Sequence, residues 1–505
     1  MHQLSVIDTT FLATETQRTP NHLCMLGIYD PSGASGGAPS FEQIMAKLES
    51  CLALVPSLRH KLLRVPLDLD RPYWVDDHDF DLEFHVRQLA LPRPGDWRQL
   101  RTQVARLHSR PLDLTRPPWE ITVIDGLDSV LEYPEGCFAT ALKVHHAAID
   151  GQSGVELLNV LHDLTADLPP PDGLVEPWTP EPLPSGSDLL RRAGVHAIEN
   201  PLQAVRAVAA NVTPLAREAV TAGRRRSPGP KVVRTRFNHP VSAHRTWEET
   251  RCSLADMKRV KNQVAGASIN DACLSVVAGA MTSYLTALGE PPTESLVTTV
   301  PVSTRTPDQV ASGGNQISGM LVSFHSDIDD PLDRLAAIAA ETATKKAAQS
   351  GVAIPVLLEV AEVLPGALIG AAVRGASLLG SRAPVAANTV VTNVPGSPVP
   401  LYFLGCELVR STGCVPLVDG VGLFHCVTSF CGVFTFMFTA DRDLMPDPEV
   451  YRGHLEASIA EHLAAAAESE KLAVSQQAAT RAGMRSTAKQ STAKKQTARE
   501  PTDFR

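Results

Sequence analysis

The segment 141–154, ALKVHHAAIDGQSG, ends an apolar run with two adjacent histidines and then places an aspartate before a glycine. An imidazole titrates near a pKa of ~6.5, so a histidine that faces a cleft is suited to act as a general base toward a hydroxyl. Successive residues of an extended segment point to opposite faces, which disfavours one metal ion held by both His145 and His146. Asp150 is placed to orient a histidine or to pair with a distant arginine, and Gly151 allows the backbone to reverse. The motif is therefore compatible with a general base and disfavours a metal site.

A structural interpretation of the same residues stays open at this point, namely a buried histidine pair beside an Asx turn. The flanking pattern locates the motif without deciding between the two interpretations. Residues 137–144 alternate as in a strand, and apolar positions repeat with helical spacing from 155 to 164. The histidines are thus expected where a strand passes into a helix through a glycine turn.

The composition is that of an ordinary globular protein and limits the classes of function. The 505 residues are 44% hydrophobic and 20% charged, and the formal net charge of -9 gives no support for nucleic-acid binding. The 9 cysteines form no C-x-x-C pair and no zinc-type spacing, and no secretory signal pattern is visible. We expect reduced thiols, no bound metal and a cytoplasmic location.

Alternating helix and strand patterns divide the chain and predict an α/β fold with two sandwich domains around one central cleft. We place an N-terminal domain, which carries the histidine motif, at 1–168, and a proline-rich linker with a helical connector at 169–232. A C-terminal domain then covers 233–465. The last segment, 466–505, is basic and nearly free of large apolar residues beyond residue 475, so we expect a disordered tail.

A second polar group lies at the start of a predicted helix. Ser268 and Asp271 have the spacing of a capping box, and Asn270 is placed to satisfy another group of the first turn. The alternative is that Asn270 and Asp271 shape the active centre. Both interpretations stay open from the sequence.

Two segments have unusually apolar faces. Within 353–380 two glutamates and a proline interrupt the apolar run, and a charge near a bilayer centre costs roughly 2.5–3.5 kcal/mol. A membrane-spanning helix is therefore disfavoured, and packing is the simplest role for such faces. We also consider that this segment or 188–222 lies at a lipid surface, with the arginines 224–226 near anionic headgroups.

Several motifs, in a fixed order along most of residues 4–455, are similar to those of one known family. HHAAIDG resembles the HHxxxDG signature of CoA-dependent acyltransferases, and the remaining motifs resemble the bacterial wax ester synthase/diacylglycerol acyltransferase family within it. These motifs are LSVIDTTFLATETQRTPNHLCMLGIYDP (4–31), PLDLTRPPWE (111–120), SINDACLSVVAGAM (268–281), PVSTR with GGNQISGMLV (301–322), TNVPGSPVPLYFLGCEL (392–408) and PLVDGVGL (416–423). The resemblance implies two chloramphenicol-acetyltransferase-like domains around the cleft.

The resemblance also implies the reaction and the residues that perform it. His146 would be the general base in a catalytic set with His145 and Asp150, and it would deprotonate a lipid hydroxyl that attacks an acyl-CoA thioester directly. The acceptor would be diacylglycerol or a long-chain alcohol, and acyl-CoA would be a co-substrate with no further cofactor. Asp150 would have a structural role and pair with an arginine, for which Arg305 of PVSTR is the candidate. Such an enzyme would bind peripherally to the inner membrane or to a lipid droplet.

Two other functions remain as alternatives, and one motif departs from the family pattern. The chain is also compatible with an HHxxxDG transferase of the condensation or polyketide-associated type, or with a non-catalytic lipid-binding protein on a membrane or droplet. A binding protein would be expected to lose His146, which is present here. The family's Pro-Leu-Trp is Pro117-Pro118-Trp119, and the second proline stiffens the entry to the next strand. We expect Pro118 to affect substrate preference and not catalysis itself.

Overall fold

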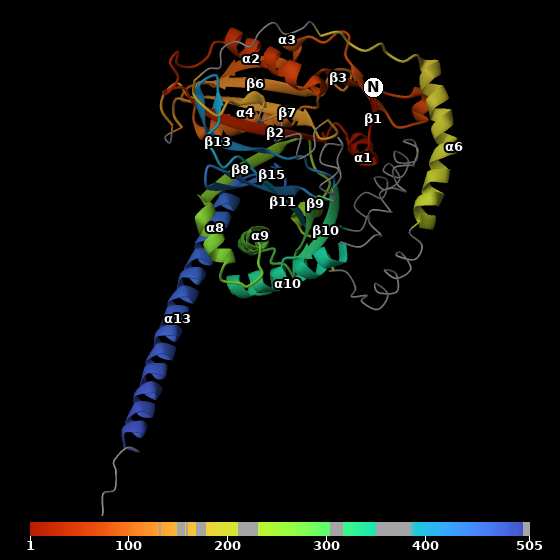
Figure 1. Ribbon diagram of the computed structural model, residues 1–505. Coiled ribbons are helices and arrows are strands. Elements are labelled where there is room, and N and C mark those ends of the chain that lie inside the picture. Colours follow the sequence, from red (N-terminus) through yellow and green to blue (C-terminus); the bar gives the residue numbers. More distant parts are fainter. Residues whose placement is uncertain are drawn as a thin grey trace, which may run out of the picture.

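The structure, a computed structural model, describes residues 1–130, 133–148, 157, 160–167, 178–210, 231–303, 317–349, 385 and 387–497. These residues form two six-stranded sheets and one three-stranded sheet, with helices packed against them (Figure 1). The α/β class predicted from the sequence is confirmed.

The first six-stranded sheet carries the histidine motif. Its strands, in spatial order, are β12 (Tyr402–Phe403), β13 (Cys406–Cys414), β2 (His22–Asp30), β7 (Phe138–His145), β6 (Trp119–Asp125) and β5 (Val86–Ala90). All neighbours are antiparallel except β5 and β6, which are parallel. Helix α2 (Phe41–Leu54) packs its apolar side on one face, and α4 (Trp97–His108) packs on the other. Strand β7 is therefore buried along almost its whole length.

The second six-stranded sheet belongs to the C-terminal half. Its strands, in spatial order, are β10 (Ile317–Ser323), β9 (Val297–Ser303), β11 (Thr389–Pro395), β14 (Leu423–Phe430), β15 (Val433–Asp441) and β8 (Arg245–Ser253). The helices of this half are α8 (Leu254–Lys261), α9 (Ile269–Ala287), α10 (Pro331–Gln349) and α13 (Pro448–Thr497). Helix α9 is buried on most sides because its small residues allow α10 and α13 to approach closely.

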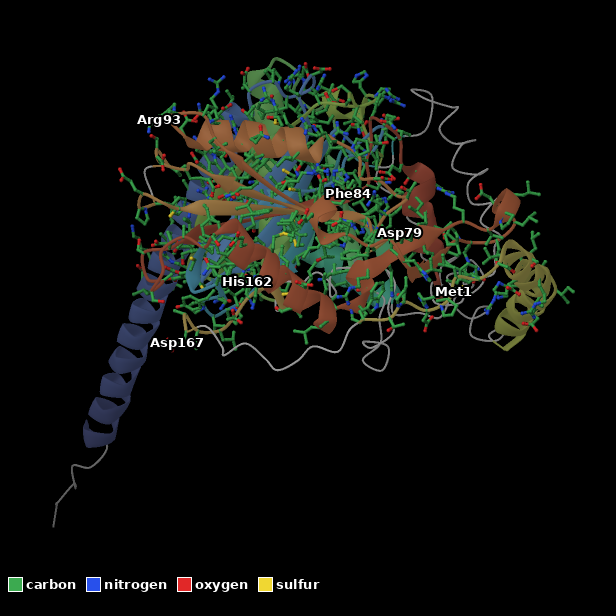
Figure 2. All side chains as sticks on the ribbon, turned by 90° about the horizontal axis from the view of Figure 1, so that it is seen from above. Met1, Asp79, Phe84, Arg93, His162 and Asp167 are labelled. Carbon is green, nitrogen blue, oxygen red and sulfur yellow. The ribbon has the colours of Figure 1, made fainter. Side chains whose placement is uncertain are left out.

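A small sheet and several short helices complete the described elements. The sheet contains β1 (His2–Gln3), β4 (Tyr73–Asp76) and β3 (His60–Leu63) in that order. The helices are α1 (Val6–Thr14), α3 (Leu82–His85) and α6 (Gly186–Ala210), with 3-10 turns at Pro56–Arg59, Pro66–Asp68 and Arg236–Asn238. Helix α6 packs on the small sheet through Leu189 and Ala193, on the Met1 side of the molecule and away from α13 (Figure 2).

The two halves of the sequence do not build separate sheets. Strand β13 pairs with β2 from Glu407 opposite Asp30 to Cys414 opposite Cys24, so residues of the C-terminal half complete the N-terminal sheet. The domain limits at 168, 232 and 465 stay a prediction. Because β12 and β13 cross over to the N-terminal sheet, which we call the strand exchange, a domain drawn as 1–168 lacks two strands of its own sheet.

Two local expectations differ from the structure. The alternation in 82–87 predicts a strand, but the Asp81 side chain accepts a hydrogen bond from the Glu83 N–H at 3.0 Å and caps a helical turn. The tail expected to be disordered from 466 is instead helical to Thr497, as a continuation of α13 that projects from the body (Figure 1). Glu470 on this helix binds the Arg259 guanidinium through both carboxylate oxygens and also accepts from the Gln263 amide, which extends the docked part past residue 466.

No helix in the described part of the chain combines the length and the apolar character needed to cross a bilayer. The segment 353–380, for which the sequence disfavours a spanning helix, lies outside the described residues.

Acid should weaken the packing of α10 on β10 through one carboxylate. Burial acts to raise the pKa of Glu341, but hydrogen bonds from His325 (2.8 Å), Lys345 and the Ser323 N–H lower it to about 2. Ionised Glu341 therefore stabilises the fold above the ordinary carboxyl range near 4.5, and this contribution is lost as the pH falls toward about 2. In Glu341→Gln, the free energy of unfolding measured by urea titration should depend less on pH between 5 and 2. An unchanged pH profile would contradict this account.

Candidate functional site

The backbone at the end of β7 is held on both sides. The His145 N–H donates to the Pro118 carbonyl at 2.9 Å, and the His146 N–H donates to the Asn21 carbonyl at 2.8 Å. Strand β7 ends at His145, and His146 begins a turn, as the sequence predicts for this position. The neighbouring segments thus fix where each imidazole leaves the backbone.

The side chain of His145 is completely buried. Its Nδ1 accepts a hydrogen bond from the Ala147 N–H at 3.1 Å, and its Nε2 lies 3.3 Å from a carboxylate oxygen of Glu15. Because Nδ1 accepts, the ring carries its proton on Nε2 and donates it to Glu15. His145 therefore connects the turn that follows β7 to the residue just after α1.

His146 has a different environment and is half-buried. Its ring stacks on Phe11 of α1, with centroids 4.1 Å apart and an angle of 18° between the planes. Asn21 supports this arrangement because its amide donates to the Phe11 carbonyl at 2.7 Å and to the Thr14 hydroxyl at 2.9 Å. The same residue thus holds both α1 and the backbone of His146.

Sequence reasoning missed Phe11, Glu15 and Asn21 as partners of the histidines. All three lie in the segment 4–31 that carries part of the family resemblance. No periodicity or spacing connects them to residues more than a hundred positions later, so only the resemblance of that segment pointed to its importance.

A buried polar layer lies behind the motif. Burial lowers the pKa of His22, and it lowers that of His108 to about 3, so both rings are neutral at ordinary pH. The buried Lys143 ammonium lies 2.6 Å from Glu120 and donates to the carbonyls of Leu107 and Arg110 at the end of α4. Lys143 therefore ties the end of α4 to β7, two residues before His145.

The segment Pro117-Pro118-Trp119 contacts the histidine motif through its backbone. The carbonyl of Pro118 accepts the His145 bond, and the ladder of β6 begins only at Trp119, opposite Val144. The missing N–H of Pro118 thus removes no bond from the sheet. The Trp119 indole donates to the Leu58 carbonyl at 2.7 Å and fixes the start of the strand.

The other predicted residues are only partly described. Asp271 closes a capping box with Ser268 and accepts a hydrogen bond from the Thr342 hydroxyl at 2.7 Å. These structural bonds satisfy both oxygens of its buried carboxylate. Asn270 is half-buried in the first turn of α9. A role for either residue in the active centre stays a prediction.

Asp150, Gly151 and Arg305 lie outside the described residues, so their pairing stays a prediction as well. Among the residues that the structure places, no group of three or more His, Cys, Asp or Glu side chains has the arrangement of a metal site.

Comparisons with known sequences match both halves of the chain. Residues 4–273 match the family described as the wax ester synthase/diacylglycerol acyltransferase catalytic domain, and residues 313–462 match its C-terminal domain. Two proteins of Mycobacterium tuberculosis, each provisionally named diacylglycerol O-acyltransferase, are 33% and 32% identical to this chain. The alignments cover 91% and 92% of this chain, and 91% and 98% of those proteins.

Solved structures with the same fold are more distant in sequence. The wax ester synthase/diacylglycerol acyltransferase from Marinobacter aquaeolei VT8 is 24% identical, with a TM-score of 0.62 over 92% of this chain and 100% of that one. The first condensation domain of the calcium-dependent antibiotic synthetase is 14% identical, with a TM-score of 0.55 over 92% and 96%. These likenesses support the predicted two-domain α/β architecture.

Proposed function

This chain belongs to the wax ester synthase/diacylglycerol acyltransferase family and is an acyltransferase, and we propose that it uses His146 to join acyl groups from acyl-CoA to lipid hydroxyls. The acceptor is diacylglycerol, which gives triacylglycerol, or a long-chain alcohol, which gives a wax ester. The observation that carries the proposal is the match over both halves of the chain together with an intact His146 at the end of β7.

The proposed reaction is a direct transfer. His146 removes the proton of the acceptor hydroxyl, and the oxygen attacks the thioester carbonyl of acyl-CoA. The tetrahedral intermediate collapses, the bond from carbon to sulfur breaks, and the CoA thiolate takes up the proton. Holding both reactants beside one base also supplies much of the rate. We propose that no metal or other cofactor takes part, because the base and the two substrates balance the reaction.

An acceptor panel tests this function. Purified protein with palmitoyl-CoA should release free CoA when diacylglycerol or hexadecanol is added, and thin-layer chromatography should show the matching ester. The rate should be unchanged in the presence of a chelator. Release of CoA that requires no acceptor would indicate a thioesterase and contradict the proposal.

Glu15 is proposed to position the histidine pair. Removing its carboxylate leaves the buried His145 Nε2–H without its acceptor, which loosens the turn that presents His146. Glu15→Ala should lower kcat about tenfold to a hundredfold, the effect of losing one hydrogen bond to a charged group, with little change in the KM for acyl-CoA. Glu15→Gln keeps an acceptor oxygen and should recover most of the rate. Equal losses in both variants would contradict a positioning role.

Lipid substrates also require contact with a lipid surface, and we propose that the protein acts in the cytoplasm, bound peripherally to a membrane or lipid droplet. Leu190, Val195 and Ile198 are exposed on α6, where Ile198 has 71% of its surface accessible. Leu190→Glu/Ile198→Glu should reduce co-flotation with phosphatidylglycerol vesicles. The matched control is Leu472→Glu on α13, a position with 57% exposure. Equal flotation of all three proteins would contradict a role for α6.

A further inference from the structure

A cavity lies at the seam between the two halves, apart from the histidine motif. Its volume is about 560 Å³, and its walls come from α4, from residues 243–246 and from residues 442–449. Six arginines line it against two acidic residues, although the whole chain has a net charge of -9. Arg101 and Arg245 are paired with Glu248 and Asp441 behind the wall, which leaves four arginines as the excess positive charge of the cavity.

The first wall carries a row of three arginines and a threonine along α4 and the turn after it. Arg98, Thr102, Arg106 and Arg110 follow one another at intervals of four residues, so they share one side of the helix and of the turn after it. Within the described residues, neither Arg106 nor Arg110 has an ion-pair partner for its exposed guanidinium. Arg106 and Arg110 are like charges four residues apart and repel each other, so a bound anion between them would be favourable, whereas Arg98 already interacts with Glu449.

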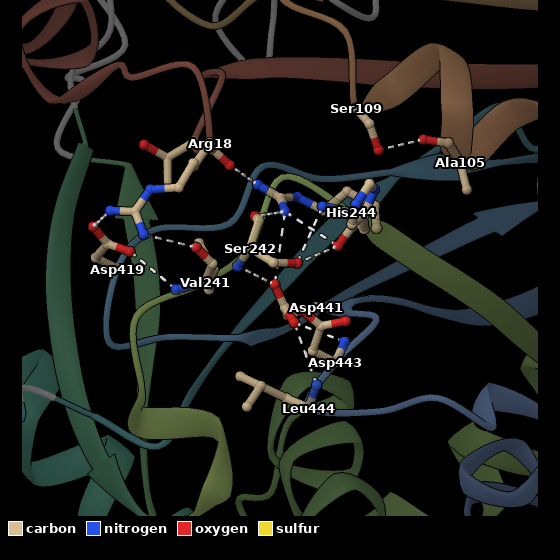
Figure 3. Close-up of polar contacts among 12 residues, drawn as sticks. Arg18, Ala105, Ser109, Val241, Ser242, His244, Asp419, Asp441, Asp443 and Leu444 are labelled. Carbon is tan, nitrogen blue, oxygen red and sulfur yellow. Dashed lines mark hydrogen bonds and ion pairs between the residues drawn. The ribbon is translucent and has the colours of Figure 1, made fainter.

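The opposite wall is rigid, and its arginine is compensated: the buried Arg245 guanidinium lies 4.0 Å from a carboxylate oxygen of Asp441, so this wall supplies shape and no free charge. The buried Arg245 guanidinium donates to the carbonyls of Ser242 at 2.6 Å and His244 at 3.3 Å and also binds the Arg18 carbonyl. Asp441 accepts from the N–H groups of Ser242, Asp443 and Leu444 at the base of this wall (Figure 3). These bonds hold the segments 242–246 and 441–444 in place before any ligand binds.

The positive groups outnumber the acidic groups at the mouth of the cavity. Arg101 is shared between Glu248 and Glu449 and has no charge to spare, so Glu449 and Asp447 face the four other arginines of the mouth, namely Arg98, Arg106, Arg110 and Arg442. Arg442 is exposed and, in the described part of the chain, makes no ion pair. Helix α13 also begins here at Pro448, and the start of a helix favours negative charge.

We propose that this cavity binds the nucleotide end of CoA through its 3′-phosphate and pyrophosphate groups. Arginine forks suit phosphate oxygens, and the volume is within the range of small-molecule sites, roughly 300–1,000 Å³. The carbonyl of Arg110 accepts from Lys143 at 2.8 Å, so the cavity wall is bonded directly to β7 two residues before His145. The inference rests on the proposed function, because acyl-CoA is the phosphate-bearing substrate of that reaction.

Calorimetric titration with CoA and with adenosine 3′,5′-bisphosphate tests the cavity. Arg106→Gln/Arg110→Gln should bind both at least about tenfold more weakly than the wild type, since each lost charged hydrogen bond costs about that much. Dephospho-CoA should bind the wild type more weakly than CoA. In turnover assays the KM for acyl-CoA should rise while kcat at saturation changes less than about twofold. The control Arg64→Gln/Arg93→Gln removes two exposed arginines elsewhere and should match the wild type.

The outcomes separate this inference from the proposed function. Wild-type affinity for CoA in the cavity variant, with an unchanged melting temperature, would overturn the inference even if acyl transfer is intact. Loss of flotation on phosphatidylglycerol vesicles with unchanged CoA affinity would overturn it too and assign the cavity to lipid headgroups. A wild type that binds CoA through these arginines but transfers no acyl group would support the cavity and reject the proposed function.

Discussion

Replacing His146 with alanine is expected to lower kcat for acyl transfer by about 10²–10⁴-fold, the usual contribution of a positioned base. The fold should survive because the side chain is half-buried in a turn beyond β7. The backbone bond from His146 to the Asn21 carbonyl does not depend on the imidazole and remains. Release of free CoA from palmitoyl-CoA with diacylglycerol measures the loss, and thermal unfolding verifies the fold.

A matched histidine variant separates this effect from a general one. His239 is exposed, and its carbonyl accepts a bond from the Gly420 N–H, so His239→Ala should keep the wild-type rate. Added imidazole should restore part of the activity of His146→Ala, because a free base can enter the space left by the side chain. If the His146→Ala protein releases CoA at the wild-type rate, His146 is not the general base.

The largest effect on stability is expected from Glu248, which joins the two halves. This buried carboxylate on β8 accepts from Trp97 at 2.8 Å and from Arg101 at 2.9 Å, and both donors belong to α4. Glu248→Ala removes the acceptor of the Trp97 indole and one of the two carboxylates on Arg101, which keeps Glu449, so the free energy of unfolding should fall by about 3 kcal/mol, the lower end of the range for a broken buried pair. Burial raises the pKa of the Glu248 carboxyl, so Glu248→Gln, which is neutral and keeps one of the two acceptor oxygens, should lose less.

An exposed ion pair provides the comparison for Glu248. Glu290 lies 3.6 Å from Arg236 with 45% of its side chain exposed, and Glu290→Ala should change the stability by less than about 0.5 kcal/mol. Denaturant titration of the three variants gives the differences. Equal midpoints for Glu248→Ala and Glu290→Ala would show that the charged seam between the halves does not stabilise the fold.

Sequence patterns located those elements whose signals are local. The strand expected at 137–144 is β7, and the capping box expected at Ser268 and Asp271 begins α9. The strand expected at 82–87 failed because Asp81 caps a helical turn, a choice that a short alternation does not reveal. Local sequence signals therefore predicted the start of α9 correctly, whereas a short alternation was not enough to predict a strand.

The contacts around the histidines, and those between the two halves of the chain, could not be predicted from local sequence patterns. Phe11 and Glu15 contact the histidines through tertiary packing, and no residue pattern near position 145 predicts these contacts. Glu248 and Glu249 are adjacent acidic residues in an edge strand, a pattern typical of solvent exposure. They are buried because α4 and β13 of the other sheet supply Arg101 and Arg410.

The strand exchange has a consequence for how the chain is made. Strands β2, β5, β6 and β7 are complete once residue 145 has been synthesised, more than 250 residues before β12 and β13. Until residues 402–414 leave the ribosome, the edge of β2 that faces β13 has no partner strand. An open edge of this kind invites pairing with another nascent chain. The arrival of β13 therefore closes the N-terminal sheet and delays its completion to the last fifth of translation.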